Sequence, residues 1–273
     1  MTLTRTEVHQ LLESHGLAPS RALGQNFVAD PNTVRRIARL AGVGPGDHVL
    51  EIGAGLGCLT LALAETGAAV TAVEVDKYLV PLLREVVEPV GASVIEADAM
   101  TADWPSILAG HDRWTLVANL PYNISTPLVL DLLDHVPAID RMLVMVQREV
   151  GERLTATVGD KAYGIPSVKV AYWATARVAG KVSPSVFIPE PNVESALVQI
   201  ERRPSPATDA DAEAMFRLVR MAFGQRRKML RRSLAAEVSD DAFAASGTRP
   251  EARPEELDIE QWGRLTTAVA ARP

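Results

Sequence analysis

Residues 49–63 read VLEIGAGLGCLTLAL, and this stretch decides the fold. A short apolar run leads into three glycines at alternate positions, Gly53, Gly55 and Gly57, and an uncharged, helix-favouring run follows them. Glycine is needed where a backbone adopts positive φ or approaches a ligand closely. The order of strand, glycine turn and helix predicts the first unit of a doubly wound α/β sheet, with free N–H groups at the helix N-terminus for a polar ligand.

An acid, Glu51, lies two positions before the first glycine and gives the pattern E-x-G-x-G-x-G. A dinucleotide-binding turn reads G-x-G-x-x-G instead. The observed variant resembles motif I of the methyltransferases that use S-adenosylmethionine. The alternative is a glycine turn that only packs a helix against a strand, and the rest of the chain decides between the two.

The composition limits the kind of protein this can be. The 273 residues suit one large domain and a small one, and the net charge of −6 means that any nucleic-acid site must be local. The one cysteine, Cys58, excludes an internal disulfide, fits a reducing cytoplasm and is expected to be a packing residue. The histidines lack metal-ligand spacing, so we expect no metal site. We also expect no signal peptide and no membrane span.

Apolar runs bounded by turn residues predict further strands and helices. The last apolar strand follows a rigid, proline-rich loop at residues 186–195. The expected strands after the glycine turn are residues 69–75, 93–96, 114–118, 141–147, 177–182 and 196–200, and the expected helices include residues 4–15, 78–87, 148–154 and 167–174, with another that begins at Asp30-Pro31.

Two acids follow neighbouring predicted strands. Glu74 ends the strand at residues 69–75, and doubly wound folds place an acid here whose two oxygens accept the ribose hydroxyl hydrogens. Asp98 follows the strand at residues 93–96 and can accept a hydrogen bond from an adenine amine. The alternative for each is a solvated acid at a strand end.

Residues 119–127, NLPYNISTP, are the most informative stretch because ligands bind beyond the carboxyl ends of strands in open α/β sheets. Asn119 offers a side-chain carbonyl, and Leu120 offers a backbone carbonyl held in place by Pro121. Tyr122 offers a flat face. Two acceptors and an aromatic face suit a planar aromatic amine, whereas an ordinary turn with a buried tyrosine would not need all four residues together.

A second region is predicted after the linker signal at residues 204–206, Pro-Ser-Pro, which divides the chain into domains 1–203 and 204–273. Residues 212–236 have a helical pattern and no acid from residue 214 onward. The cations in this region predict contacts to a phosphate backbone, and the alternative is a solvated helix face. They are Arg217, Arg220, Arg226, Arg227, Lys228, Arg231 and Arg232.

Together these motifs resemble the ribosomal RNA adenine dimethyltransferase family, and within it the bacterial small-subunit enzymes. The macrolide-resistance adenine methyltransferases share the glycine turn and an NLPY-like stretch, but the other motifs are closer to the small-subunit enzymes. One departure is Val28, where the family often has leucine. The resemblance rests on LGQNF (23–27), EIGAGLGCLT (51–60), EADAM (96–100), NLPYNISTP (119–127), QREVGERL (147–154), GDKAYG (159–164) and FIPEPNVESA (187–196).

The resemblance implies a Rossmann-like class I methyltransferase fold, with a seven-stranded, mostly parallel sheet whose last strand is antiparallel, and a small all-α C-terminal domain. It implies S-adenosylmethionine as cofactor and N6,N6-dimethylation of two adjacent adenosines near the 3′ end of 16S rRNA, in the small ribosomal subunit or its precursor, during ribosome biogenesis. We expect a cytoplasmic monomer without a membrane partner.

The expected site combines residues argued from the chain with contacts carried over from the family. Tyr122 and Phe187 are expected to stack on an adenine that has left its helix, and catalysis is expected from placement rather than from a strong base. The catalytic residues are Asn119, Leu120, Pro121, Tyr122 and Phe187; the cofactor contacts are Asn26, Val28, Gly53, Glu74, Asp98 and Asn119; the RNA-binding residues are Arg226, Arg227, Lys228, Arg231 and Arg232.

Three other functions compete with this hypothesis. A nicotinamide dehydrogenase would need G-x-G-x-x-G and a catalytic His or Tyr-Lys arrangement, which the chain lacks. A 23S rRNA resistance methyltransferase would use the same chemistry on another RNA. A non-catalytic RNA-binding assembly factor would keep the basic helix without needing residues 119–122.

Overall fold

The structure, a computed structural model, describes residues 2–271, which form two units. Unit 1 contains the residues up to 151 and residues 177–201, and unit 2 contains residues 152–176 and those from 202 onward. The strands of the described residues are β1 (Phe27–Val28), β2 (His48–Ile52), β3 (Ala69–Glu74), β4 (Ser93–Glu96), β5 (Trp114–Asn119), β6 (Ile139–Gln147), β7 (Ala174–Val182), β8 (Phe187–Ile188) and β9 (Ser195–Arg202). The α-helices are α1 (Arg5–Ser14), α2 (Pro31–Ala41), α3 (Cys58–Ala64), α4 (Val80–Val87), α5 (Trp104–Ile107), α6 (Ser125–His135), α7 (Arg148–Thr155), α8 (Ile165–Trp173), α9 (Ala212–Gly224), α10 (Leu230–Ser233), α11 (Asp240–Ser246) and α12 (Ile259–Ala270).

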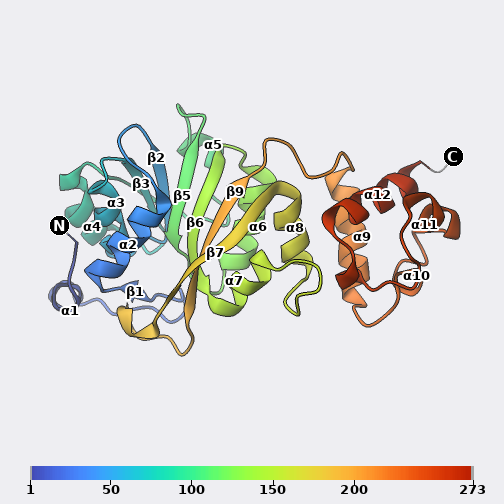
Figure 1. Ribbon diagram of the computed structural model, residues 1–273. Coiled ribbons are helices and arrows are strands. Elements are labelled where there is room, and N and C mark those ends of the chain that lie inside the picture. The colour runs from blue at the N-terminus through green and yellow to red at the C-terminus, as the bar shows by residue number, and fades with distance from the viewer. Residues whose placement is uncertain (1, 272–273) are drawn as a thin grey trace. The chain divides into compact units, whose positions relative to one another are not determined.

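Within the described residues, the central sheet has seven strands in the order β4-β3-β2-β5-β6-β9-β7 (Figure 1). β2 is parallel to both β3 and β5, and β9 is antiparallel to β6. The chain winds from β2 outward to β4 and then returns to β5 on the other side of β2. The winding therefore reverses between β2 and β5, and this reversal opens a crevice beyond the carboxyl ends of these strands. The sheet confirms the predicted Rossmann-like fold.

The strand predictions are confirmed within three residues at every strand end. The inner strands β2, β5 and β6 are buried along most of their length, which explains why they are continuous apolar runs rather than alternating ones. α2 begins where expected, because the side chain of Asp30 accepts a hydrogen bond from Thr33 N at 2.9 Å and Pro31 occupies the first turn. No helix among residues 2–271 is long and apolar enough to cross a membrane.

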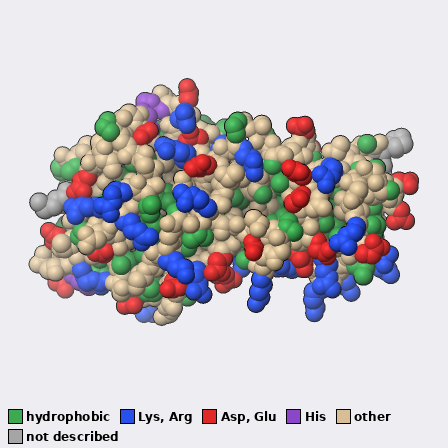
Figure 2. Space-filling model, viewed as in Figure 1, with side chains coloured by type: hydrophobic (Ala, Val, Ile, Leu, Met, Phe, Trp, Pro, Cys, Tyr) green, Lys and Arg blue, Asp and Glu red, His purple; other side chains and the backbone are tan. Residues whose placement is uncertain are grey.

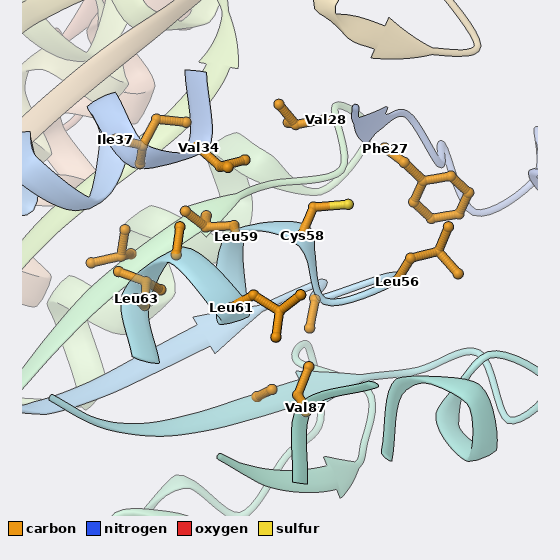
Figure 3. Close-up of a cluster of buried hydrophobic side chains, with 14 of the residues drawn as sticks. Phe27, Val28, Val34, Ile37, Leu56, Cys58, Leu59, Leu61, Leu63 and Val87 are labelled. Carbon is orange, nitrogen blue, oxygen red and sulfur yellow. The ribbon is translucent and has the colours of Figure 1, made fainter. Parts of the chain in front are cut away.

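The glycine turn is fixed by its close neighbours. Gly55 has φ of 58°, and a Cβ built on it would lie 2.8 Å from the ring of Phe27. A Cβ built on Gly57 would overlap Cγ1 of Val87 in α4. Figure 3 shows the ring of Phe27 beside Leu56, with the other side chains of this apolar cluster around the turn. Glycine therefore allows β1 and α4 to close onto the turn from different elements.

Cys58 begins α3 and lies among the apolar side chains of this cluster (Figure 3). Burial raises the pKa of its thiol to about 12. The thiol is therefore neutral near physiological pH, which agrees with the expected packing role and not with a nucleophile.

Unit 2 has a separate hydrophobic core formed by α8 and the helices from α9 onward. Tyr163 and Tyr172 are buried in it, and their hydroxyls donate to Leu257 O at 2.8 Å and to Ala210 O at 3.1 Å. The sequence placed the domain boundary at 203/204, whereas the packing groups residues 152–176 with the C-terminal helices. The apolar pattern at residues 167–174 predicted a packed helix but carried no signal for its packing partner.

Some short elements were not predicted. β1 pairs with β8, so that Phe27 lies opposite Ile188 and Val28 opposite Phe187, in segments that were expected to be a connector and a proline-rich loop. Two-residue strands have no periodicity to recognise. α6 was not assigned either, and it begins at Ser125 inside the NLPYNISTP stretch. The expected helical region at residues 212–236 is interrupted after Gly224, between α9 and α10.

Gly57→Ala should destabilise the protein more than Gly91→Ala. Both glycines have nearly the same backbone conformation, with φ of 81° and 87°, so both variants carry the cost of about 1–2 kcal/mol for a side chain there. The Gly91 Cβ would meet no atom within 4 Å, whereas the Gly57 Cβ would overlap Val87. Overpacking adds about 1–3 kcal/mol. Urea unfolding measures the difference, and equal losses would contradict the packing explanation.

Candidate active site

A pocket lies at the carboxyl ends of β2, β3 and β5, at the point where the winding of the sheet reverses. Its walls come from the segment before α2, the glycine turn, the end of β3, the turn after β4 and the residues after β5. Of the expected catalytic and cofactor residues, Phe187 alone is absent from the lining. The others that line it are Asn26, Val28, Gly53, Glu74, Asp98, Asn119, Leu120, Pro121 and Tyr122.

The glycine turn and the Asn119–Tyr122 loop are in direct contact. A Cβ on Gly53 would lie 3.3 Å from Pro121 Cδ and 3.6 Å from the carbonyl oxygen of Asn119. Gly53 N donates to Val73 O at 2.8 Å, which ties the turn to β3. The loop that offers the two acceptors is therefore part of the same wall as the glycines, as the sequence predicted.

Asn119 and Leu120 each present an acceptor that no described residue uses. Asn119 Nδ2 donates to the carbonyl of Asn26 at 2.9 Å, so its Oδ1 is the end of the amide left open. Leu120 N donates to Met145 O at 3.1 Å, and the Leu120 carbonyl accepts no hydrogen bond within residues 2–271. Polar acceptors without partners are suited to bind N–H donors of a ligand.

The two expected stacking residues have different surroundings. Tyr122 is half-buried in the pocket wall, and burial raises the pKa of its hydroxyl above the ordinary value. Phe187 is fully buried in β8, opposite Val28, and belongs to the hydrophobic core. The structure therefore does not bring Phe187 into the pocket. Its stacking role stays a prediction, and it requires a movement of the proline-rich loop.

The acids after β3 and β4 both reach the pocket. Glu74 accepts three backbone hydrogen bonds, to Oε2 from Gly55 N at 2.8 Å and to Oε1 from Val75 N and Asp76 N at 3.0 Å. Burial raises the pKa of Glu74, although these N–H groups oppose the shift. A carboxylate has about four acceptor positions, so one position on Oε2 is left for a ligand hydroxyl. Asp98 is exposed, and its Oδ1 accepts from Met100 N at 2.9 Å.

Glu51 is a pocket residue that was absent from the expected site, although its place before the first glycine marked it in the motif. Its side chain is 2% exposed, and its Oε2 has no hydrogen-bond partner within the described residues. Burial and, to a smaller extent, the nearby charge of Glu74 raise the pKa of Glu51 to about 8, although the side chain of Thr60 opposes the shift. An orphaned carboxyl oxygen in the wall, with a second buried acid nearby, fits a ligand that carries cationic or donor groups.

The segment before α2 is fastened across this pocket by several hydrogen bonds. Gln25 Nε2 donates to Asp76 Oδ2 at 2.9 Å, and the carbonyl of Asn26 accepts from Asn119. Nearer the N-terminus, Arg5 Nη2 donates to Phe187 O at 3.1 Å. These contacts join the N-terminal segment to β3, β5 and β8. They explain how residues 23–28, which have no strong periodicity, become a wall of the site.

The seven basic residues of the stretch 212–236 fall into two groups. Arg217, Arg226 and Arg231 have acidic neighbours, at 2.8 Å from Glu237, 3.6 Å from Glu255 and 3.2 Å from Glu251. The second group consists of exposed cations that have no acidic partner among residues 2–271; these are Arg220, Arg227, Lys228 and Arg232. Figure 2 shows Lys and Arg side chains along one edge of the C-terminal helices, with acidic side chains among them. These acids lie beyond residue 236. The absence of acids from residues 214–236 therefore led to an overestimate of the number of cations without an acidic partner.

The described residues contain no group of three or more His, Cys, Asp or Glu that could hold a metal ion.

Comparison with known proteins adds independent observations. The family model described as ribosomal RNA adenine dimethylase matches residues 18–270 of the chain. Two relatives are each described as ribosomal RNA small subunit methyltransferase A. The one from Bifidobacterium adolescentis is 43% identical and covers 98% of this chain and 94% of its own length. The one from Thermobifida fusca is 46% identical and covers 96% of this chain and 94% of its own length.

Solved structures agree with these relatives. A crystal structure of the 23S rRNA methyltransferase ErmE has a TM-score of 0.70 at 27% identity and covers 89% of this chain and 99% of its own. A dimethyladenosine transferase from Plasmodium falciparum has a TM-score of 0.72 at 25% identity and covers 86% of this chain and 94% of its own.

Glu51→Gln should flatten the dependence of stability on pH in the absence of ligand. The carboxyl loses its proton near pH 4.3 in the unfolded chain but only near pH 8 in the native protein. Between these values the native state binds more protons, so its free energy of unfolding falls as pH rises, by about 1.4 kcal/mol per pH unit at most. The amide cannot ionise, and the variant should lose this slope.

Urea unfolding at several pH values between about 5 and 8 measures this difference. Glu96→Gln removes an exposed carboxyl and is the matched control. Parallel pH curves for the wild type and Glu51→Gln would contradict the assignment of a neutral, buried carboxyl.

Proposed function

Because the chain belongs to the ribosomal RNA adenine dimethylase family, we propose that it dimethylates N6 of two adjacent adenosines near the 3′ end of 16S rRNA, in the small ribosomal subunit or its precursor. The chain is an rRNA adenine dimethyltransferase, and its methyl donor is S-adenosylmethionine. The observation that carries the finer proposal is the meeting of two unused acceptors, at Asn119 and Leu120, with the glycine turn in one pocket.

The pocket wall has groups suited to each part of the cofactor, which supplies an electrophilic methyl on a sulfonium. Glu74 Oε2 would accept from a ribose hydroxyl of the cofactor, and Asp98 would accept from the amine of the cofactor's adenine. Gly53 leaves room for close approach, while Asn26 and Val28 close the pocket from the N-terminal segment. A cation bound beside Glu51 and Glu74 would favour the ionised forms of these buried acids, and the acids would in turn favour a cationic ligand over a neutral one.

The target amine is held by acceptors rather than by a base. Asn119 Oδ1 and the Leu120 carbonyl accept the two hydrogens of the adenine amine, which keeps its lone pair directed at the methyl. Placement of this kind lowers the barrier without a proton acceptor of high pKa, because the nitrogen loses its proton readily once it is alkylated. After the first transfer the amine has one hydrogen left. One acceptor is then enough to hold the remaining hydrogen, so Asn119 Oδ1 and the Leu120 carbonyl also serve the second transfer.

The adenine must leave its stack to reach the pocket, and Tyr122 supplies a face for it there. Stacking on an aromatic side chain contributes about 1–3 kcal/mol per base. The RNA backbone is held by the cations of unit 2. Among them Arg227, Lys228 and Arg232 contribute most, since no described acid neutralises them, and Arg226 and Arg231 contribute less because each shares its charge with an acid.

A second candidate, methylation of 23S rRNA, is favoured by one observation, the structural likeness to ErmE. The two candidates share the pocket chemistry and differ only in the RNA. We favour the small subunit because the relatives from Bifidobacterium adolescentis and Thermobifida fusca are similar at higher identity over nearly the full chain. We further propose that the protein acts in the cytoplasm, as a monomer and away from membranes.

The site of methylation decides between these RNAs. Small and large subunits from cells that lack this protein are incubated with it and a labelled methyl donor, and the modified adenosines are mapped by primer extension. We expect dimethyl-adenosine at two adjacent positions near the 3′ end of the small-subunit RNA. Label confined to the large-subunit RNA would refute the proposed substrate.

Asn119→Ala should lower the rate of methyl transfer by at least about 100-fold, because it removes an acceptor that acts on the reacting amine. Asn123→Ala is the control, since Asn123 lies in the same loop, is exposed and does not line the pocket. Single-turnover rates and the thermal unfolding of both variants are compared. Wild-type turnover in a folded Asn119→Ala variant would exclude the acceptor role.

The double variant Arg227→Gln, Lys228→Gln should weaken RNA binding and reduce the salt dependence of the binding constant. Each lost phosphate contact lowers the slope of log K against log salt by about 0.7–0.9. Arg217→Gln is the matched control, because Arg217 is already neutralised by Glu237 at 2.8 Å. Filter binding to small subunits at several salt concentrations tests this prediction. An unchanged slope in the double variant would remove these cations from the interface.

A further inference from the structure

The ring of Tyr122 is held at its far end by a buried serine. The hydroxyl oxygens of Tyr122 and Ser195 are 2.8 Å apart and share a hydrogen bond. Ser195 is 0% exposed, and this is the hydrogen bond that its hydroxyl makes within the described residues. Because burial raises the pKa of the Tyr122 hydroxyl, the phenol stays protonated and the bond persists across the physiological pH range.

Ser195 is fixed in the frame of the sheet. It is the first residue of β9 and lies opposite Gln147 of β6. Directly before it, Glu194 O accepts from Arg148 N at 2.9 Å, and the side chains of these two residues form an ion pair at 2.9 Å. The strand pairing and the contacts of the neighbouring Glu194 therefore leave the Ser195 hydroxyl little freedom to move.

The same strand, β6, also positions the Asn119–Tyr122 loop, which carries the two acceptors. Asn119 at the end of β5 lies opposite Met145 of β6, and Met145 lies opposite Leu197 of β9. β6 therefore holds both the strand that ends in Asn119 and the strand that begins with Ser195. The distance between the amine acceptors and the anchor of the Tyr122 ring is set by the pairing of three neighbouring strands.

The other end of Tyr122 is held as well, because its carbonyl accepts from Ser125 Oγ at 3.2 Å at the start of α6. The torsion that turns a tyrosine ring about its own axis has broad minima, so packing alone defines the ring plane weakly. The phenol oxygen lies on this axis, so a hydrogen bond there fixes the position of the far end of the ring. It also favours one ring plane, because the phenol O–H bond prefers to lie in the plane of the ring. The energy of stacking depends on that plane, since a tilted ring shares less of its face with the base.

From these contacts we infer that Ser195 is a positioning residue for methyl transfer, which holds the Tyr122 ring in the plane on which the target adenine stacks. The inference rests on the proposed function, and it adds a residue that acts only through Tyr122. Ser195 contacts neither substrate nor cofactor in this role. Loss of its hydroxyl should therefore affect placement of the base and leave cofactor binding unchanged.

The test is a double-mutant cycle with Ser195→Ala, Tyr122→Phe and the double variant. Single-turnover rates are measured on small subunits from cells that lack this protein, at saturating S-adenosylmethionine, and the cofactor dissociation constant is measured separately. Each single variant should slow transfer by about two- to tenfold, the range for one hydrogen bond. The double variant should be no slower than Tyr122→Phe, because the serine acts through the phenol. Cofactor affinity should match the wild type.

Ser246→Ala is the matched control, since Ser246 is a buried serine in unit 2 whose hydroxyl donates to Phe243 O at 3.0 Å. It should lose stability without a change in the rate of transfer by the folded protein. Multiplicative losses in the double variant, or an equal fall in cofactor affinity for Ser195→Ala, would show a general structural role and overturn the inference. A wild-type rate in folded Ser195→Ala would also overturn it.

The outcomes separate this inference from the proposed function. If the wild type methylates the expected adenosines and Ser195→Ala does so equally fast, the inference fails and the proposed function stands. If the wild type methylates neither adenosine, the proposed function itself fails. Should Ser195→Ala not fold, Tyr122→Phe carries the test alone, because it removes the same hydrogen bond at a half-buried position. An unchanged rate in that variant overturns the inference.

Discussion

The hydrogen bond from Asn119 Nδ2 to the carbonyl of Asn26, at 2.9 Å, determines the chemistry of the pocket. This hydrogen bond uses the amide donor of Asn119 within the protein, so the amide acceptor, Oδ1, is left for a ligand. It also ties the segment before α2 to the end of β5, so the same contact closes the pocket and orients its acceptor. The reversal of winding between β2 and β5 provides the crevice, and this hydrogen bond decides which groups the crevice binds.

The electrostatics of the pocket work against the stability of the ligand-free protein. Glu51 and Glu74 are both buried, and burial raises the pKa of each. A well-packed apolar pair would make a more stable core, but it would not favour a positively charged methyl donor over a neutral product. The Glu74 carboxylate is partly compensated by three backbone N–H groups, whereas Glu51 Oε2 has no partner within residues 2–271. Glu51 is therefore the acid whose ionisation a bound cation would favour most.

Much of this could be predicted from the sequence, where local patterns carried the information. The glycine turn, Glu74 at a strand end and residues 119–122 at the end of β5 were identified by spacing, and their meeting in one pocket follows from the rule for parallel strands. The burial of Phe187 and its pairing with Val28 could not be predicted, because they depend on a contact between distant segments with no periodicity. The acids near Arg226 and Arg231 come from residues 251 and 255 and were missed for the same reason.

A complex of the protein with S-adenosylhomocysteine and the target RNA tests the central claim most directly, through the surroundings of the adenine N6 atom. The account predicts that N6 lies about 2.7–3.2 Å from both Asn119 Oδ1 and the Leu120 carbonyl oxygen, with Asn119 Nδ2 still donating to Asn26 O. An adenine amine outside hydrogen-bond distance of these two oxygens, or an Asn119 amide turned so that Nδ2 faces the base, would contradict it.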